Sequence, residues 1–398
     1  MSAPPLVSTP ADRAAAPLRV GMVAGEASGD LLAGRLIDGM QTRWNGLEVC
    51  GIGGLQMVGR GMQAWWPQDK LSVHGFSWEL IRRYREIVGI RRQLRDRLIA
   101  DPPDVFIGVD APDFNLALEA DLRASGTKTV HFVCPSVWAW RPQRMELLRR
   151  AADHVLCIFP FEPELLQREG IASTFVGHPL AQLIPMQPDR AAARRVLGLA
   201  DDALVLAILP GSRRSEIDYL APLFFAAAAR MLASRPALQL VVPAAPGLRA
   251  RIEAAARNSG LHGHLHIVDG QSHAALAACD TVLLASGTAT LEAALFKRPM
   301  VIAYRMSWLS AALIGRKLLQ PWVGLPNILN RRFVVPELLQ DAATPAALAQ
   351  ATLEWLDAAQ HAPERLQELQ DCFTTMHHNL LRDTPALASD AIAQVVQG

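Results

Sequence analysis

The sequence predicts an α/β protein made of two Rossmann-like domains with a cleft between them. Short apolar runs typical of buried parallel strands alternate with segments of helical periodicity, and this alternation restarts after a short linker at residues 185–188. The length of 398 residues also exceeds what one hydrophobic core usually serves. We therefore expect one domain over residues 18–184, a second over 185–359, and separate helices over 360–398.

Composition narrows the class of protein. Apolar residues make up 51% of the chain and the net charge is +1, so no global charge attracts nucleic acid. The five cysteines form no CxxC pair, which fits a reducing cytosolic compartment. No apolar run approaches the roughly 18–20 residues of a membrane span. Residues 1–17 lack an apolar signal core and indicate a disordered tail.

The first domain opens with a strand, a glycine loop and a helix. The strand covers residues 19–24 and is followed by residues 25–30 (Gly-Glu-Ala-Ser-Gly-Asp), which include Glu26 and Ser28. The loop lacks the GxGxxG spacing, so a dinucleotide cofactor is not favoured. Further strands of this domain are expected at residues 49–54, 104–108, 129–134, 155–159 and 174–176.

An arginine-rich helix is expected at residues 79–100, next to several tryptophans. Trp65, Trp66 and Trp78 precede it, and its apolar residues recur at helical spacing. Aromatic residues beside a basic helix face suit an anionic membrane surface. The alternative is an ordinary solvated helix face over a tryptophan-containing core. The arginines nearest the tryptophans are Arg82, Arg83 and Arg85.

Polar side chains follow two strands of the first domain. The strand at residues 104–108 runs into Asp110 and Asp113, and the strand at residues 129–134 runs into Trp138. The carboxyl ends of parallel strands are where open α/β sheets bind their ligands. We therefore expect these residues to lie near a substrate.

The second domain repeats the pattern and adds a phosphate-binding turn. An apolar strand at residues 281–285 breaks at Ser286 and Gly287 and passes into a helix at Thr288. A helix that starts at a glycine turn presents backbone N–H groups and a positive dipole end to an anion. Glu292 lies one turn further on the same face, within reach of a sugar hydroxyl. The alternative is a capped helix carrying a solvated glutamate.

The other turn of interest follows the strand at residues 204–209. It contains Ser212 and Arg213 but is not a Walker loop, because the GK[ST] ending is absent. A metal site is not expected, since the alternating histidines at 262, 264 and 266 have no carboxylate or cysteine beside them. Further elements are expected at residues 219–233, 238–242, 248–259, 266–268, 300–304, 344–359 and 363–397.

Taken together, these motifs resemble lipid-A-disaccharide synthase. The similarity runs from about Leu18 to the C-terminal helices, and its most specific stretches are residues 110–115 (Asp-Ala-Pro-Asp-Phe-Asn) and 135–141 (Pro-Ser-Val-Trp-Ala-Trp-Arg). The other matching stretches are residues 25–30, 209–213, 286–292 and 325–327.

The resemblance implies a two-Rossmann (GT-B) fold whose C-terminal helices return to the first domain, with a homodimer as a possible assembly. It implies a cytoplasmic enzyme held peripherally on the inner membrane face, without a metal or other cofactor. The implied reaction transfers 2,3-diacylglucosamine from its UDP derivative to 2,3-diacylglucosamine 1-phosphate. The products are UDP and the lipid A disaccharide 1-phosphate.

The site residues follow from this chemistry. Developing charge on the leaving UDP needs fixed donors, which Arg213 and the backbone at Gly287 and Thr288 supply. Asp110 is the better candidate for the general base that deprotonates the acceptor, with Asp113 behind it. The remaining donor-site candidates are Ser212, Ser286, Glu292 and Asn327. The candidates for contact with the acceptor or lipid are Glu26, Ser28 and Trp138, with the tryptophans and arginines of the basic stretch.

Two other classes remain open at this stage. One is another UDP-sugar enzyme on the same fold, such as a UDP-GlcNAc 2-epimerase or the peptidoglycan N-acetylglucosaminyltransferase. The other is a non-catalytic membrane-surface scaffold, against which the intact Asp110, Arg213 and Glu292 argue.

Overall fold

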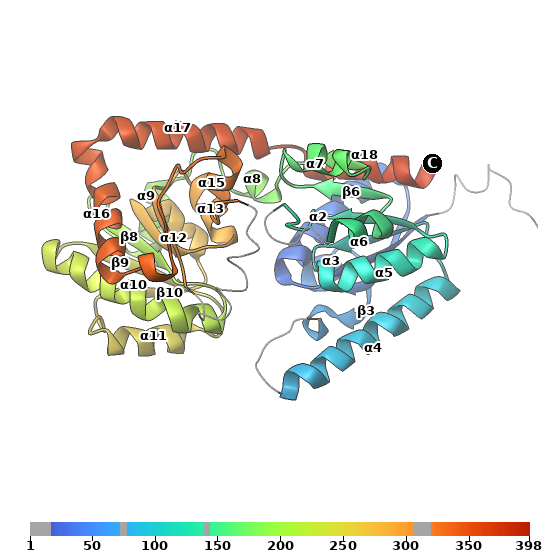
Figure 1. Ribbon diagram of the computed structural model, residues 1–398, viewed down its shortest axis with the longest axis horizontal. Helices are drawn as coiled ribbons and strands as arrows, with labels where there is room; N and C mark the ends of the chain where they lie inside the picture. Colours follow the sequence, from blue (N-terminus) through green and yellow to red (C-terminus); the bar gives the residue numbers. More distant parts are fainter. Residues whose placement is uncertain (1–16, 72–77, 139–143, 306–319) are drawn as a thin grey trace, which may run out of the picture. The chain divides into compact units, whose positions relative to one another are not determined.

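The chain forms two compact units (Figure 1). The computed structural model describes residues 17–71, 78–138, 144–305 and 320–398, with the backbone alone at residues 27, 69 and 78–84. The first unit comprises the chain up to Pro179 together with Leu380–Gly398, and the second comprises Leu180–Asn379.

The first unit contains a parallel sheet in the order β3-β2-β1-β4-β5-β6-β7. Its strands are β1 (Leu18–Ala24), β2 (Leu47–Gly53), β3 (Gln63–Pro67), β4 (Val105–Val109), β5 (Lys128–Phe132), β6 (His154–Cys157) and β7 (Ser173–Phe175). Its helices are α2 (Ala27–Arg43), α3 (Leu55–Val58), η1 (Gln68–Lys70), α4 (Trp78–Ala100), α5 (Pro112–Ala124), α6 (Arg144–Ala151), α7 (Glu162–Arg168) and α18 (Thr384–Gln397).

The second unit contains a parallel sheet in the order β10-β9-β8-β11-β12-β13. Its strands are β8 (Val205–Leu209), β9 (Gln239–Ala244), β10 (Leu265–Asp269), β11 (Thr281–Ala285), β12 (Met300–Tyr304) and β13 (Glu337–Leu339). Its helices are α9 (Arg190–Leu197), α10 (Arg214–Ser234), α11 (Arg249–Asn258), α12 (Ser272–Ala278), α13 (Thr288–Leu295), α15 (Leu325–Asn330), η2 (Gln340–Ala342), α16 (Pro345–His361) and α17 (Pro363–Leu380). The short helix α8 (Pro179–Leu183) begins at the boundary between the units.

The central strands explain why the sequence predicts this fold. Every residue of β4 and of β11 is buried, as expected for strands whose two sheet faces are both covered by helices. Such strands read as continuous apolar runs, which is how they appear in the sequence. The prediction of an α/β protein with two Rossmann-like domains is confirmed.

Each sheet has a point where the strand order reverses. In the first unit the chain builds outward from β1 to β3 and then returns to place β4 on the other side of β1. The second unit does the same with β8 and β11. Ligands of open α/β sheets bind outside the carboxyl ends of the strands at this switch point. A ligand site is therefore expected at the turns after β1, β4, β8 and β11.

The boundaries differ from the predicted ones near the C-terminus. The sequence assigns residues 360–398 to helices on the first domain, but most of α17 belongs to the second unit. His377, on α17, is fully buried; its Nε2 lies 2.8 Å from the Ala181 carbonyl oxygen and its Nδ1 lies 2.6 Å from Lys297 Nζ. Only α18 returns to the first unit, where it packs on α2 and β6. The first crossing likewise falls after Pro179 instead of at residue 184.

One helix of the described chain, α10, is long and apolar enough to cross a membrane by length and composition. Half of its apolar window is buried within the protein, and it contacts α11 and α16. Its buried residues include Leu220, Phe224 and Ala228. This is the environment of a core helix in the second unit.

Candidate functional site

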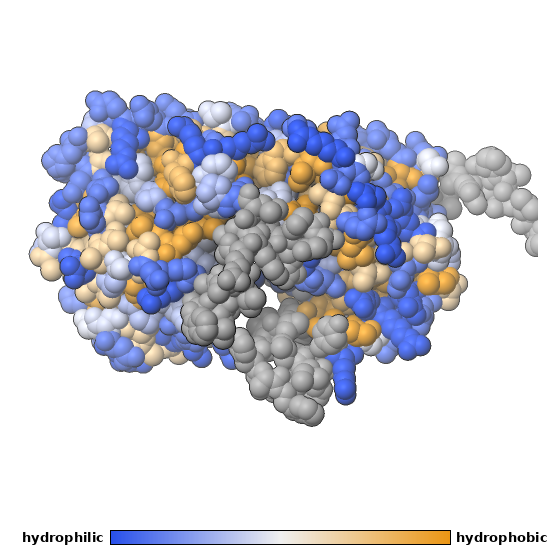
Figure 2. Space-filling view, viewed as in Figure 1, coloured by the Kyte–Doolittle hydropathy of each residue, from blue (hydrophilic) through white to orange (hydrophobic). Residues whose placement is uncertain are grey.

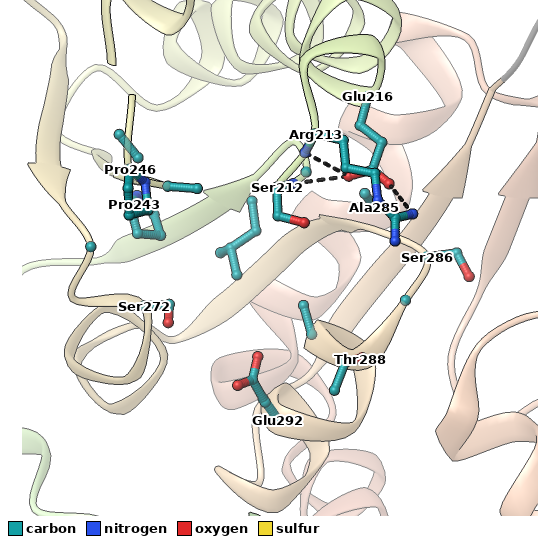
Figure 3. A pocket seen from close by; sticks show the side chains of 17 residues that line it. Ser212, Arg213, Glu216, Pro243, Pro246, Ser272, Ala285, Ser286, Thr288 and Glu292 are labelled. Carbon is teal, nitrogen blue, oxygen red and sulfur yellow. Dashed lines mark hydrogen bonds and ion pairs between the residues drawn. The ribbon is translucent and has the colours of Figure 1, made fainter. Parts of the chain in front are cut away.

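A pocket of about 400 Å³ lies at the switch point of the second unit (Figure 3). The turn after β8 lines it with Ser212 and Arg213, and the turn after β11 lines it with Ser286 and Gly287. On α13, Thr288 and Glu292 complete that side of the pocket. The structure thus brings together six of the seven predicted donor-site residues.

The turn after β8 is shaped by a glutamate that the sequence analysis misses. Glu216 Oε2 accepts hydrogen bonds from the backbone N–H groups of Ser212 (2.9 Å) and Arg213 (3.2 Å). Gly211 has a φ of 130°, and a Cβ there would lie 2.4 Å from the Glu216 Cβ. Only glycine therefore fits beneath this glutamate. The sequence does contain a pattern that could have identified Glu216: a glutamate three residues after the N-cap of a helix is typical of a capping box.

Arg213 combines a fixed backbone with an accessible side chain. Its backbone N–H is held by Glu216, whereas its side chain is 72% exposed and its Nη1 lies 3.5 Å from Glu216 Oε1. The guanidinium is therefore positioned at the pocket, with most of its donors available to an anion. The Glu216 carboxylate also acts on Tyr304: burial and this negative charge raise the pKa of the tyrosine.

The turn after β11 presents backbone N–H groups. Gly287 is the N-cap of α13, no side chain caps this helix, and a Cβ on Gly287 would meet nothing within 4 Å. The Ser286 hydroxyl donates to the Val323 carbonyl oxygen at 3.1 Å, which ties the turn to the segment before α15. Open space at an uncapped helix N-terminus suits a phosphate.

Glu292 lies on the pocket side of α13, with its side chain 19% exposed, and its carboxylate points between Ser272 and Thr288 (Figure 3). Its Oε1 lies 3.0 Å from the Nε2 of His273 on α12. His273 is a second residue that the sequence analysis misses.

Asn327 has a different place from the one predicted. It is fully buried on α15 and is not among the residues that line the pocket. Its Nδ2 donates to Glu337 Oε1 and to the Val335 carbonyl oxygen, and its Oδ1 accepts from the N–H groups of Val334 and Val335. With its amide used in this way, Asn327 supports the loop beside the pocket, and direct contact with nucleotide or sugar would require breaking these bonds.

In the first unit, Asp110 lies at the equivalent switch point. It directly follows β4, and both Asp110 and Ala111 have positive φ values, 52° and 44°. Left-handed backbone at two consecutive non-glycine residues is a strained arrangement of the kind that clusters at functional sites. The fully buried Asn115 holds the turn, because its Nδ2 donates to the Asp110 carbonyl oxygen at 2.8 Å.

Asp113 lies in the first turn of α5. Its side chain is 83% exposed and forms an ion pair with Arg144. The N-cap of α5 is Ala111, which makes no side-chain cap. Asp113 thus differs from Asp110 in being on the helix surface instead of at the strand end.

Trp138 belongs to an aromatic cluster formed by residues that follow β5 and β6 of the first sheet. Its ring packs edge-on against Phe159 and Phe161, and its Nε1 donates to Glu162 Oε1 at 3.1 Å. Burial raises the pKa of Glu162 to about 8, although hydrogen bonds from Trp138 and the backbone oppose the shift. Glu26, the N-cap of α2, and Ser28 in its first turn are exposed at a neighbouring turn of this sheet.

The predicted membrane residues fall partly outside the described chain. The side chains of Trp78, Arg82 and Arg83 are not described, whereas Arg85 is exposed on α4. Trp65 and Trp66 lie on the edge strand β3 and pack against the core of the first unit; the Arg97 guanidinium lies 3.7 Å from the Trp65 ring centre.

No group of three or more histidine, cysteine, aspartate or glutamate side chains suited to a metal ion occurs among the described residues. The pocket itself offers an arginine, backbone N–H groups and two carboxylates, Glu216 and Glu292.

Two Rossmann-like units, each built on a parallel sheet, define the class of two-domain α/β proteins with a GT-B-like fold. Solved structures agree on the fold. The UDP-GlcNAc 2-epimerase of Neisseria meningitidis bound to UDP-GlcNAc aligns with 96% of this chain and 100% of its own, at a TM-score of 0.63 and 13% identity. A glycosyltransferase of Rickettsia africae aligns with 96% and 98%, at a TM-score of 0.58 and 10% identity. Sequence comparison then separates the members of this class.

The sequence model of the lipid-A-disaccharide synthetase family matches residues 20–392. The lipid-A-disaccharide synthase of Albidiferax ferrireducens is 66% identical over 381 residues, which cover 96% of this chain and 98% of the relative. The one of Bordetella pertussis is 52% identical over 394 residues, covering 96% and 99%. The chain belongs to the lipid-A-disaccharide synthase family. It is a UDP-sugar-dependent glycosyltransferase of lipid A biosynthesis, and the epimerase alternative is not favoured.

Proposed function

We propose that the chain transfers 2,3-diacylglucosamine from UDP-2,3-diacylglucosamine to the 6-hydroxyl of 2,3-diacylglucosamine 1-phosphate with inversion, releasing UDP. The observation that carries the proposal is the pocket of the second unit, where an exposed arginine and an uncapped helix N-terminus converge. These groups match the charge that develops on a leaving diphosphate.

The donor side uses groups in the second unit. Arg213 binds the diphosphate through its guanidinium fork, and the N–H groups at the start of α13 bind it through the helix dipole. Glu292 accepts hydrogen bonds from the ribose hydroxyls, while Ser212 and Ser286 line the same pocket. Asn327 acts indirectly, through the loop that it holds.

The acceptor side uses the first unit. Asp110 removes the proton from the acceptor hydroxyl, and the strained turn held by Asn115 fixes its position. Asp113 is the second choice, because its carboxylate is on the surface and paired with Arg144. Glu26, Ser28 and Trp138 also follow the carboxyl ends of strands in this sheet, and we propose that they contact the acceptor sugar or its acyl chains.

The deciding experiment is an assay of UDP release with acceptors that carry or lack acyl chains. The proposal requires turnover with 2,3-diacylglucosamine 1-phosphate and little or none with glucosamine 1-phosphate. UDP release that ignores acylation would favour another UDP-sugar enzyme, and no release with any acceptor would favour a scaffold. Because the proposed phosphate ligands are Arg213 and α13, activity should survive EDTA; loss that added Mg²⁺ restores would overturn the metal-free mechanism.

We also propose that the enzyme is cytoplasmic and attaches to the anionic inner face of the membrane through the region around α4. Along this helix, hydrophobic and strongly hydrophilic residues lie side by side (Figure 2). Arg85 and Arg92 are exposed, and Ile87 and Val88 are half-buried. Basic residues beside apolar ones favour an anionic lipid surface.

The test replaces Arg82, Arg83 and Arg85 with glutamate and measures co-sedimentation with anionic vesicles. Each basic residue near such a surface contributes about 1 kcal/mol, so the triple variant should be released. High salt should partly release the wild type by screening.

A charge-matched control replaces the exposed arginines of the second unit, Arg195, Arg251 and Arg257, with glutamate. It should stay bound to the vesicles. Equal retention of both triple variants would mean that α4 packs only against protein.

A further inference from the structure

His273 contacts a carboxylate of the pocket without lining the pocket itself. Its Nε2 lies 3.0 Å from Glu292 Oε1, and the two side chains are 38% and 19% exposed. The two residues come from α12 and α13, the helices that precede and follow β11 in the sequence. A carboxylate only accepts hydrogen bonds, so the imidazole must carry its proton on Nε2 in this contact.

The position of the imidazole is set from two sides. Its ring packs edge-on against Phe296, with the ring centres 5.3 Å apart at an angle of 63°. Glu292 and Phe296 are four residues apart, so both face His273 from the same side of the α13 segment. Gly270 and Gln271, with φ values of 65° and 52°, set the direction in which α12 begins.

This arrangement matters because glutamate has three rotatable side-chain bonds. A carboxylate that must be ordered when a ligand arrives loses rotamer entropy at that moment. His273 holds Oε1 beforehand and leaves the remaining lone pairs of the carboxylate to the pocket.

We infer that His273 is a positioning residue that orients the Glu292 carboxylate for recognition of the hydroxyls of the nucleotide ribose. The inference rests on the proposed assignment of this pocket to the UDP group. It extends that assignment by naming a residue that strengthens the preference of Glu292 for a ribose over a sugar without these hydroxyls.

The experiment compares the affinities for UDP and for 2′,3′-dideoxy-UDP by calorimetry. The contact between the Glu292 carboxylate and the ribose hydroxyls is worth about 1 kcal/mol, so the wild type should prefer UDP by about 5-fold. In His273→Ala, UDP affinity should fall about 2- to 4-fold, while affinity for the dideoxy compound stays nearly constant. The preference for the ribose hydroxyls should shrink accordingly.

Three further variants identify the cause. His273→Gln, whose amide N–H reaches a similar point, should restore part of the preference. Combining His273→Ala with Glu292→Ala should give the affinity of Glu292→Ala alone, because both act through one carboxylate. His264→Ala, an exposed histidine outside the pocket lining, should bind both compounds as the wild type does.

The outcomes separate the inference from the assignment of the pocket. If Glu292→Ala changes neither affinity, the pocket does not hold the ribose and the assignment is wrong. If Glu292→Ala abolishes the preference but His273→Ala leaves it intact, the inference is wrong. Equal weakening of both compounds in His273→Ala, with no rescue by glutamine, would reduce His273 to a structural role and also overturn the inference.

Discussion

The equivalent turns of the two units differ in charge. After β1 and β4, the first unit has Glu26 and Asp110; after the equivalent strands β8 and β11, the second unit has Arg213 and Gly287. Glu26 and Arg213 are both N-caps of the helix that follows, and Ala111 and Gly287 are the N-caps of α5 and α13. The elements follow one another in the same order in both units, and the side chains at the turns differ.

The backbone differs at these turns as well. Gly287 has φ 153° and ψ −162°, a region that is essentially open to glycine alone, and nothing approaches its missing Cβ. Ala111 has φ 44° and ψ 54°, which an alanine adopts under strain, and the buried Asn115 holds that turn. One unit leaves its helix N-terminus open to an anion, and the other places carboxylates there.

The comparison shows that a single architecture supplies switch points without deciding their chemistry. The proposed transfer needs donors for a leaving diphosphate and an acceptor for a proton. Those two requirements fall on different units because the residues at equivalent turns differ, and the fold is common to both.

The largest expected effect is on the reaction rate, when the carboxylates of the first unit are replaced. Asp110→Asn should lose about 10²–10⁴-fold in rate, the usual contribution of a general base, while UDP affinity stays unchanged. Single-turnover UDP release and calorimetric titration measure the two quantities. Asp113→Asn should keep most of the rate and lose less than about 1 kcal/mol of stability, since its ion pair is exposed. If the two variants exchange these phenotypes, Asp113 is the base; if both keep the rate, Glu26 or His178 is the next candidate.

The next largest effect is on UDP affinity, when side chains of the pocket in the second unit are replaced. Arg213→Ala should weaken UDP binding by about 1.5–3 kcal/mol, because it removes a charge-assisted contact to phosphate. Glu292→Ala should lose less, about 1 kcal/mol, the value of bonds to neutral hydroxyls. Calorimetry with UDP measures both.

Two control variants sharpen this result. Glu26→Ala changes the equivalent N-cap of the first unit, and Arg214→Ala removes the exposed neighbouring charge. Neither should alter UDP affinity. Unchanged binding in Arg213→Ala would place the phosphate site elsewhere and remove the contrast between the units.

The smallest effect concerns the backbone at the two N-caps. Gly287→Ala should cost about 1–3 kcal/mol of stability and also weaken UDP binding, since the backbone must leave a glycine-only region. Ala111→Gly should leave stability within about 1 kcal/mol, because relief of left-handed strain offsets the added freedom of the unfolded chain. Urea unfolding measures both. Equal destabilisation by both substitutions would contradict the backbone difference proposed here.

The sequence by itself determined the parallel sheets and the turns that matter. Strands covered on both faces are continuous apolar runs, and a polar or glycine turn after such a run marks the carboxyl end of the strand. That reasoning predicts Asp110, Arg213 and Gly287 at strand ends or helix starts and Glu292 one turn into a helix, which is where they lie. These are local properties, because a strand and the turn after it can be recognised within a segment of about ten residues.

Only the tertiary structure decided which side chains support those turns. His273 lies 19 positions from Glu292, and Asn327 reaches Glu337, 10 positions away, so neither contact has a local signature. The two ends of the second unit meet in the same way, because His377 contacts Ala181, 196 positions earlier. A periodic pattern indicates which face of a helix is buried, but the partner is set by packing between distant segments. For that reason the places of Asn327 and α17 differ from those predicted.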